Sequence, residues 1–282
     1  MLRPLLVIIV AASACSAPGT PGATPGTAKD APPAKAPAPV PATVPAAAPA
    51  PTPAPVLGEP FYRPGDRAQQ VDAFTFWGWS KDGRYFAYET YDHGPGAATC
   101  EGEVDLFVVD ADTDTFVKDG HLEFKPAHPD KEPCDPPDLH AAMDAVRPAL
   151  LKKYGIDPGH LCAPIQPKLL GDAPPHGKRY ALPLPSGKTA AATLEVLHGG
   201  RDTAHEGKGA AFKLSVAVGD APPLLIEPGQ RRRPYVWDYD LGPLFLSPDG
   251  SHAAFVINTI RLSFEGDRSS VMTSGVVVPA DW

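Results

Sequence analysis

From Leu57 to its end, the chain alternates short apolar runs with polar segments rich in Gly, Pro and Asp. Runs of aromatic and β-branched residues bounded by such turn residues predict β-strands. The first four runs predict a four-stranded antiparallel meander, over residues 74–79, 84–91, 104–109 and 115–117. Further strands are predicted over residues 191–197, 212–218, 224–226, 235–239, 244–246, 253–257 and 276–278.

One helix interrupts the strands, over residues 138–154. Apolar residues recur there at helical spacing, at Leu139, Met143, Val146 and Leu150. Asp138 is suited to cap the first turn and Gly155 to end the last one, while Pro148 predicts a kink. The pattern therefore predicts a mainly β domain over residues 57–282 with one inserted α-helix.

The start of the chain resembles a secretion signal over residues 1–14, with Arg3 followed by an apolar run and small residues. Cys15 follows directly and resembles the acylated cysteine of bacterial lipoproteins, although Ala12 stands where leucine is usual in that motif. Plain secretion with an unmodified cysteine is the alternative, because the same residues suit ordinary signal peptidase.

Between Ser16 and Val56, 26 of 41 residues are Pro or Ala and none is aromatic. Such a segment buries too little apolar surface to offset its ordering entropy, so residues 15–56 are expected to form a lipid anchor and a disordered linker. Fully extended, the linker would reach about 120 Å from a membrane. An inert spacer is favoured over a docking ligand for a proline-reading domain.

Three further cysteines are disulfide candidates, because an exported protein reaches an oxidising compartment. They are Cys100, Cys134 and Cys162, and sequence does not choose among the three pairings. No C-x-x-C pair occurs, and the spacings match no zinc pattern. We therefore expect no metal and no cofactor.

The formal net charge of −8 argues against a nucleic-acid partner, because phosphate binding needs a basic surface. Residues 57–282 alone hold 22 basic and 32 acidic residues, so the domain is near −10. The expected partners are the membrane, reached through the N-terminal lipid, and a protein or glycan.

No catalytic residue is predicted. Ser80 lies in a sequence that resembles a nucleophile elbow, but a strand follows it instead of a helix, so its hydroxyl is expected to bond the turn. Asp110, Asp112 and Asp114 begin like a calcium-binding loop, but Thr115 replaces the required glycine, and a solvated turn is expected. The nine histidines are scattered and are expected on exposed loops.

One basic run precedes an aromatic strand, and together they form a possible ligand face: Arg231, Arg232, Arg233, Tyr235, Trp237 and Tyr239. Strand alternation would place the three aromatic side chains on one face, where they would suit a glycan or an anionic polymer. The alternative is that the aromatic residues belong to the core and the arginines form a solvated edge.

A Ser-x-Asp-Gly turn leading into an apolar strand occurs twice, at residues 80–83 and 247–250. It resembles the blade hairpins of TolB-type β-propellers, which implies antiparallel sheets of blade-like hairpins, as a partial or irregular propeller or a two-sheet β fold. The order of motifs along residues 74–278 resembles the bacterial family of predicted secreted proteins called domain of unknown function 2259. The resemblance rests on residues 78–89, the central helix, the second turn and residues 263–268, and it implies no known activity.

These observations predict a lipid-anchored or secreted protein of the bacterial cell envelope, whose domain is a non-catalytic binding or interaction module. An envelope hydrolase with a site assembled from distant loops, and a purely structural envelope component, stay open as alternatives. Convergent carboxylates or histidines in a cleft would favour the hydrolase, and an open aromatic or charged surface would favour binding.

Overall fold

The computed structural model describes residues 57–58, 70–71, 73–92, 102–125, 137–159, 161–173, 177–263, 266–280 and 282. The predicted signal peptide, Cys15 and the Pro/Ala-rich linker lie outside the described residues, as do Cys100 and Cys134. No helix within the described ranges is both long and apolar enough to cross a membrane.

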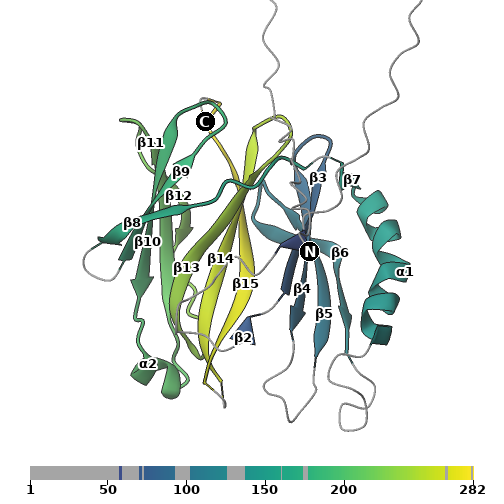
Figure 1. Cartoon of the computed structure of the whole chain (residues 1–282), viewed down its shortest axis with the longest axis horizontal. Helices are drawn as coiled ribbons and strands as arrows, with labels where there is room; N and C mark the ends of the chain where they lie inside the picture. The colour runs from purple at the N-terminus through teal and green to yellow at the C-terminus, as the bar shows by residue number, and fades with distance from the viewer. Residues whose placement is uncertain are drawn as a thin grey trace, which may run out of the picture.

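Three sheets and a helix are stacked in four layers (Figure 1). Sheet A has the order β1-β3-β4-β5-β6, with β7 also on β3: β1 (Leu57–Gly58), β3 (Ala73–Ser80), β4 (Tyr85–Asp92), β5 (Glu103–Asp110), β6 (Thr115–Phe124) and β7 (Ile156–Asp157). Sheet B has the order β13-β14-β15-β2: β2 (Gln70–Val71), β13 (Val236–Leu246), β14 (His252–Ser263) and β15 (Gly266–Val277). Sheet C has the order β12-β11-β10-β9-β8: β8 (Lys168–Ala173), β9 (Gly177–Pro183), β10 (Thr189–Leu197), β11 (Ala211–Val218) and β12 (Leu224–Pro228).

Sheet B lies in the middle of the stack and is covered on both faces. Phe255 and Ile257 of β14 pack with sheet C, whereas Ala254 and Val256 pack with sheet A. Because side chains alternate along a strand, a strand between two sheets needs apolar residues at every position. This explains why residues 253–257 are apolar without interruption.

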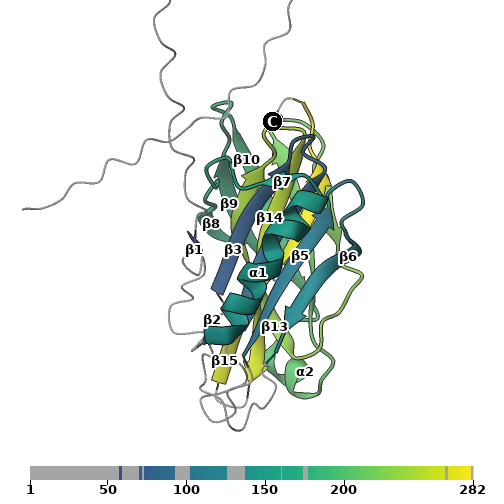
Figure 2. The same cartoon turned by 90° about the vertical axis from the view of Figure 1, so that its right-hand side faces the viewer.

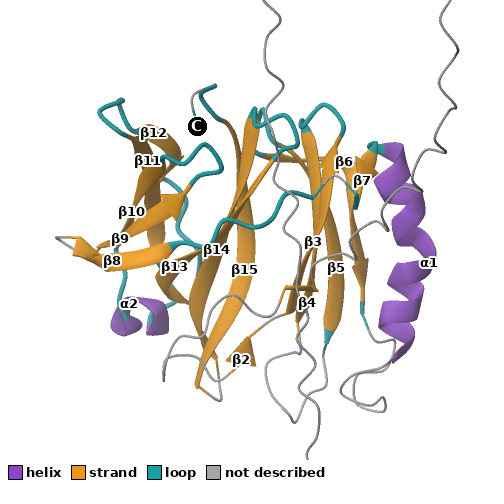
Figure 3. Ribbon diagram, turned by 45° about the horizontal axis from the view of Figure 1, so that its top comes forward, coloured by secondary structure: helices purple, strands orange, loops and turns teal. Residues whose placement is uncertain are grey.

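Helix α1 (Pro137–Lys153) covers the outer face of sheet A, at the opposite end of the stack from sheet C (Figures 2 and 3). Its buried residues, Leu139, Met143, Leu150 and Leu151, pack on Val104, Leu106 and Val108 of β5. The helix begins one residue before the predicted start, so Asp138 lies inside it and is not the cap. A second, five-residue helix, α2 (Arg201–His205), connects β10 to β11.

The mainly β class with one inserted helix is confirmed, and so is the antiparallel meander, formed by β3 to β6. The predicted alternatives were a partial propeller and a two-sheet β fold. The structure instead has three sheets that stack face to face, so a propeller is not confirmed. Strand β13 unites two predicted strands, because residues 240–243 continue the extended chain through a bulge. The pattern misses β8 and β9, whose residues do not alternate regularly.

Sheets A and B are joined through a pair of stacked aromatic rings. The rings of Phe76 on β3 and Phe245 on β13 lie 4.0 Å apart between centroids, and each side chain is about 1% exposed. Such a pair buries apolar area on both sheets and fixes how closely they approach.

We expect Phe76→Ala to lower the free energy of unfolding by about 3–5 kcal/mol, because it leaves a cavity between the two sheets. Chemical denaturation measures this loss. Phe116→Ala is the matched control, since Phe116 is 58% exposed on β6, and it should cost about 1 kcal/mol or less. Equal losses for the two variants would contradict the packing of Phe76 between the sheets.

Candidate functional site: a groove beside helix α1

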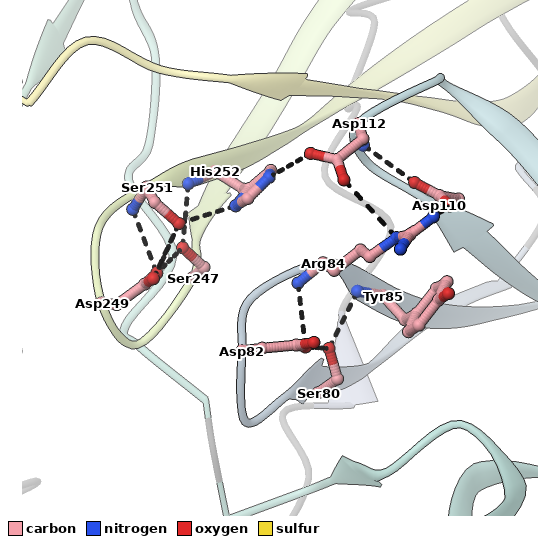
Figure 4. Close-up of polar contacts among 10 residues, drawn as sticks. All are labelled: Ser80, Asp82, Arg84, Tyr85, Asp110, Asp112, Ser247, Asp249, Ser251 and His252. Carbon is pink, nitrogen blue, oxygen red and sulfur yellow. Dashed lines mark hydrogen bonds and ion pairs between the residues drawn. The ribbon is translucent and has the colours of Figure 1, made fainter.

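The two Ser-x-Asp-Gly turns have the same internal hydrogen bonds and lie against each other (Figure 4). In the first, the Ser80 hydroxyl donates to Asp82 at 2.5 Å and accepts from the backbone of Tyr85 at 2.9 Å. The Ser80 hydroxyl thus bonds the turn, as expected. The hydrogen bond from Ser80 lowers the pKa of Asp82, so this carboxylate stays charged.

The second turn repeats this arrangement between β13 and β14. Ser247 donates to Asp249 at 2.6 Å and accepts from the backbone of His252 at 2.9 Å. A Cβ on Gly83 of the first turn would lie 2.9 Å from both Asp249 and Ser247 of the second. Glycine is therefore needed for the close approach, and the repeat seen in the sequence is a contact between two sheets.

The carboxylates of the Asp110–Asp114 turn contact residues beside both of these turns. Asp110 accepts from Arg84 at 2.7 Å, Asp112 contacts His252 at 2.9 Å, and Asp114 accepts from the backbone of Gly275 at 2.6 Å. Asp112, Thr113 and Asp114 are exposed, as expected of a solvated turn, whereas Asp110 at the end of β5 is buried. Among the described residues, no three His, Cys, Asp or Glu side chains are placed to hold a metal ion.

A chain of contacts from Ser251 through His252 to Asp112 was not foreseen from the sequence (Figure 4). The Ser251 hydroxyl lies 2.7 Å from His252 Nδ1, and His252 Nε2 lies 2.9 Å from Asp112. His252 is 8% exposed, so the expectation that the histidines lie on exposed loops is wrong for it.

The order Ser251, His252 and Asp112 resembles the nucleophile, base and orienting acid of a catalytic triad. Asp249, however, gives the Ser251 hydroxyl a second acceptor. Both Asp249 carboxylate oxygens lie 2.8 Å from the Ser251 hydroxyl. Burial opposes ionisation of Asp249, but hydrogen bonds from Ser247 and Ser251 outweigh it and lower its pKa. A charged carboxylate takes the single hydroxyl proton, so His252 is better placed to clasp sheets A and B than to activate Ser251.

A groove lies between α1, β3 and β7, near the end of the helix. Trp77, Pro148, Leu151, Ile156 and Pro158 supply its apolar lining, and the volume is about 540 Å³. This volume is typical of a small-ligand site. The lysine at residue 152 stands at the groove and has no ion-pair partner among the described residues.

A bulge in β3 points Trp77 at this groove. Phe76 pairs with Tyr88 and Gly78 with Ala87, so Trp77 is the extra residue. A bulge re-aims a side chain that regular alternation would place elsewhere.

The indole of Trp77 is held by a buried ion pair. Its Nε1 donates to Glu89 at 3.2 Å, and Arg147 Nε donates to the same oxygen at 2.8 Å. The Arg147 guanidinium lies 4.1 Å from the Trp77 ring centroid. Burial raises the pKa of Glu89, against the opposing effect of Arg147. These contacts hold one wall of the groove rigid before any ligand arrives.

A second hollow, of about 460 Å³, adjoins the groove at Gly155. Ser80, Tyr85 and Tyr154 line it, and the two tyrosine rings meet edge to face at 5.7 Å between centroids. The groove thus extends from the helix to the first Ser-x-Asp-Gly turn.

The predicted aromatic face is divided by another bulge. Val236 pairs with Arg261 and Asp238 with Ile260, so Trp237 is the extra residue of β13. Tyr239 is fully buried, whereas Tyr235 is 52% exposed. The expectation that the three aromatic side chains share a face is therefore wrong, although Tyr239 fits the alternative of a core residue.

The neighbouring residues of this face have separate partners. Trp237 Nε1 donates to Asp267 at 3.3 Å, and the Arg233 guanidinium lies 5.2 Å from the Phe212 ring centroid. Arg231 and Arg232 are exposed. A ligand role for these residues stays a prediction. Cys162 is buried and is not a free thiol, while the other candidate cysteines lie outside the described residues.

One comparison with known proteins gives a match. The model of the family described as predicted secreted protein (DUF2259) matches residues 91–274, more than half of the chain. The chain belongs to this family. No curated protein and no solved structure matches the chain. DUF2259 membership agrees with the expected export and assigns no activity, so the groove must be interpreted from its own geometry.

The buried Arg147–Glu89 pair gives a pH-dependent prediction for this DUF2259 domain. Burial raises the pKa of folded Glu89, so its proton stabilises the fold at low pH, and this contribution is lost as pH rises through the folded pKa. Removing Arg147 raises that pKa further. We expect Arg147→Met to lower the free energy of unfolding by about 3–5 kcal/mol near neutral pH and by less near pH 4.5.

Urea unfolding at the two pH values measures this difference. Adding Glu89→Gln to the Arg147→Met variant is the control, because it removes the unpaired buried charge and should recover much of the neutral-pH loss. A loss that is the same at both pH values would show that Arg147 acts only through packing.

The His252–Asp112 contact is expected to couple sheets A and B energetically. A double-mutant cycle of His252→Ala and Asp112→Ala should give a coupling energy of about 0.5–3 kcal/mol. Thr113→Ala, in the same turn but exposed, should show no coupling to His252→Ala. Additive effects of His252→Ala and Asp112→Ala would rule out the clasp.

Proposed function

We propose that this protein is a membrane-anchored module of the bacterial cell envelope that binds a partner in the groove beside α1 without chemical change. The observation that carries the proposal is the Trp77 wall, held in place by Glu89 and Arg147. A large aromatic surface that is fixed in advance binds at a lower entropic cost than a mobile one. Leu151 and Ile156 extend the apolar surface of the groove.

The anchor is lipid on Cys15, followed by the Pro/Ala-rich linker of residues 16–56. A single acyl chain binds membranes only marginally, whereas a diacylated cysteine supplies the two chains that stable anchoring requires. The oxidising compartment outside the cytoplasm supports a disulfide between Cys162 and either Cys100 or Cys134. The DUF2259 match supports export and leaves the anchor to be tested.

A hydrolase is the second candidate, because Ser251, His252 and Asp112 form a chain of contacts. The charged Asp249 beside the Ser251 hydroxyl weighs against it, since it competes with His252 for the hydroxyl proton. A fluorophosphonate probe that labels Ser251, with labelling lost in His252→Ala, would favour the hydrolase over the binding module.

Metabolic labelling with a fatty acid tests the anchor. We expect the full-length protein to take up label and to fractionate with membranes, and Cys15→Ala to lose nearly all of the label. Cys162→Ala is not a suitable control because it is buried, so Ser13→Ala, which keeps a small residue before the cleavage point, serves instead. Undiminished label in Cys15→Ala would show that the acyl chain is elsewhere.

Photo-crosslinking in intact cells tests the groove. A benzoylphenylalanine at residue 152, an exposed groove position, should give a discrete adduct with an envelope component. The same probe at residue 179, exposed on β9 at the far end of the stack, should not. Equal adducts from both positions would contradict a specific site beside α1.

A further inference from the structure

The groove opens where the chain enters sheet A. Leu57 of β1 pairs with Thr75, and Asp157 of β7 pairs with Trp79. Strand β4 occupies the other edge of β3, so β1 and β7 lie end to end along one edge. Between them, β3 presents Phe76, Trp77 and Gly78 to this edge.

The space on that edge closes abruptly at Gly78. A Cβ added there would lie 2.7 Å from the carbonyl oxygen of Asp157 and 3.4 Å from the Cα of Pro158. Glycine is required at this position, because its φ of +120° and the approach of β7 leave no room for a side chain. A segment extending β1 backwards along β3 therefore meets β7 after about two residues and must leave the edge beside Trp77.

We propose that the end of the linker, residues 51–55, leaves the edge into the groove and lies there as an extended proline-rich segment. Continued back by two residues, the antiparallel register of β1 would place Val56 beside Phe76 and Pro55 beside Trp77. Proline has no backbone N–H to give to a strand ladder, so pairing ends naturally at this point. This segment would occupy the groove until an outside partner displaces it, and the proposal rests on the proposed function of the groove as a binding site.

The chemistry of the groove matches such an occupant. Polyproline II segments dock in grooves lined by aromatic and apolar rings, because their shape is fixed before binding and costs little entropy. Trp77, Pro148 and Pro158 supply ring surfaces, with Leu151 and Ile156 between them. The indole N–H is already bonded to Glu89, so recognition comes from ring packing.

This occupant leaves most of the linker as a spacer. Residues 16–50 would still act as an inert spacer between Cys15 and the domain. Only the end of the linker, residues 51–55, gains a binding role. A tethered segment acts at an effective concentration on the order of millimolar. An outside partner must therefore displace it, and proline-rich segments of other envelope proteins are the class that would compete for the same surface.

The test uses the purified full-length protein carrying benzoylphenylalanine at residue 152, so that no other protein is present. Mass spectrometry should find an intramolecular crosslink to residues 51–55. The probe at residue 179 should yield at least several-fold less of that product. Replacing Pro51, Pro53 and Pro55 by Ser in the probe-bearing chain should reduce the crosslink several-fold and leave the domain folded, which its melting transition shows.

The outcomes separate this inference from the proposed function. A crosslink to the linker that survives the three serine substitutions would overturn recognition of proline. A crosslink between two copies, or no crosslink in the purified protein with an adduct in cells, would overturn the linker as occupant and leave the groove a site for an outside partner. No product from residue 152 in either setting would overturn both.

Discussion

Strand β14 is buried on both faces, and the other layers are positioned against it. Residues 252–260 are all buried, nine in succession, with sheet C on one face and sheet A on the other. Such a strand contributes about twice the buried side-chain area of a strand with one face in water. Sheets A and C pack on opposite faces of β14 and its neighbours, so the central sheet must form for the stack to exist.

A polar group on so deeply buried a strand is costly unless it is paired, and the two ends of β14 differ in this respect. At the start of β14, His252 is paired through Asp112, Ser251 and the turn around Ser247. Further along, Asn258 is 1% exposed and its amide has no hydrogen-bond partner among the described residues. An unpaired buried amide is costly, so the polar clasp at the first end and the aromatic pair of Phe76 and Phe245 must offset it.

The spacing of apolar residues and the residue types at the turns are the two features from which this sequence predicts structure directly. The β3–β6 meander and α1 are predictable because alternation, helical spacing and turn residues agree there. Strand β14 is predictable as a strand, although its central place is not, because an apolar run does not say which sheets cover it. β8 and β9 escape prediction because polar residues such as Lys178 and Arg179 interrupt their apolar positions.

The candidate site escapes prediction for a different reason, since it is made by one of two bulges that carry a tryptophan, together with a long-range ion pair. Trp77 and Trp237 look alike in the sequence, because each follows an apolar residue and stands two residues from another aromatic residue. One bulge turns Trp77 towards α1, and the other separates Trp237 from Tyr239. Arg147 lies 58 residues from Glu89 in the chain, and no local pattern links them. Strand alternation therefore pointed to an aromatic face that the fold divides.

The bulge at Trp77 also explains why the groove and the chain entry coincide. Gly78 follows it with a positive φ, which lets β7 approach the edge of β3 and close it. Without that approach, the edge of β3 beyond Trp77 would lack the pairing that β7 supplies. The same irregularity thus admits β7 and turns the indole towards α1. One local feature therefore creates both the groove wall and the close approach of β7 beside it.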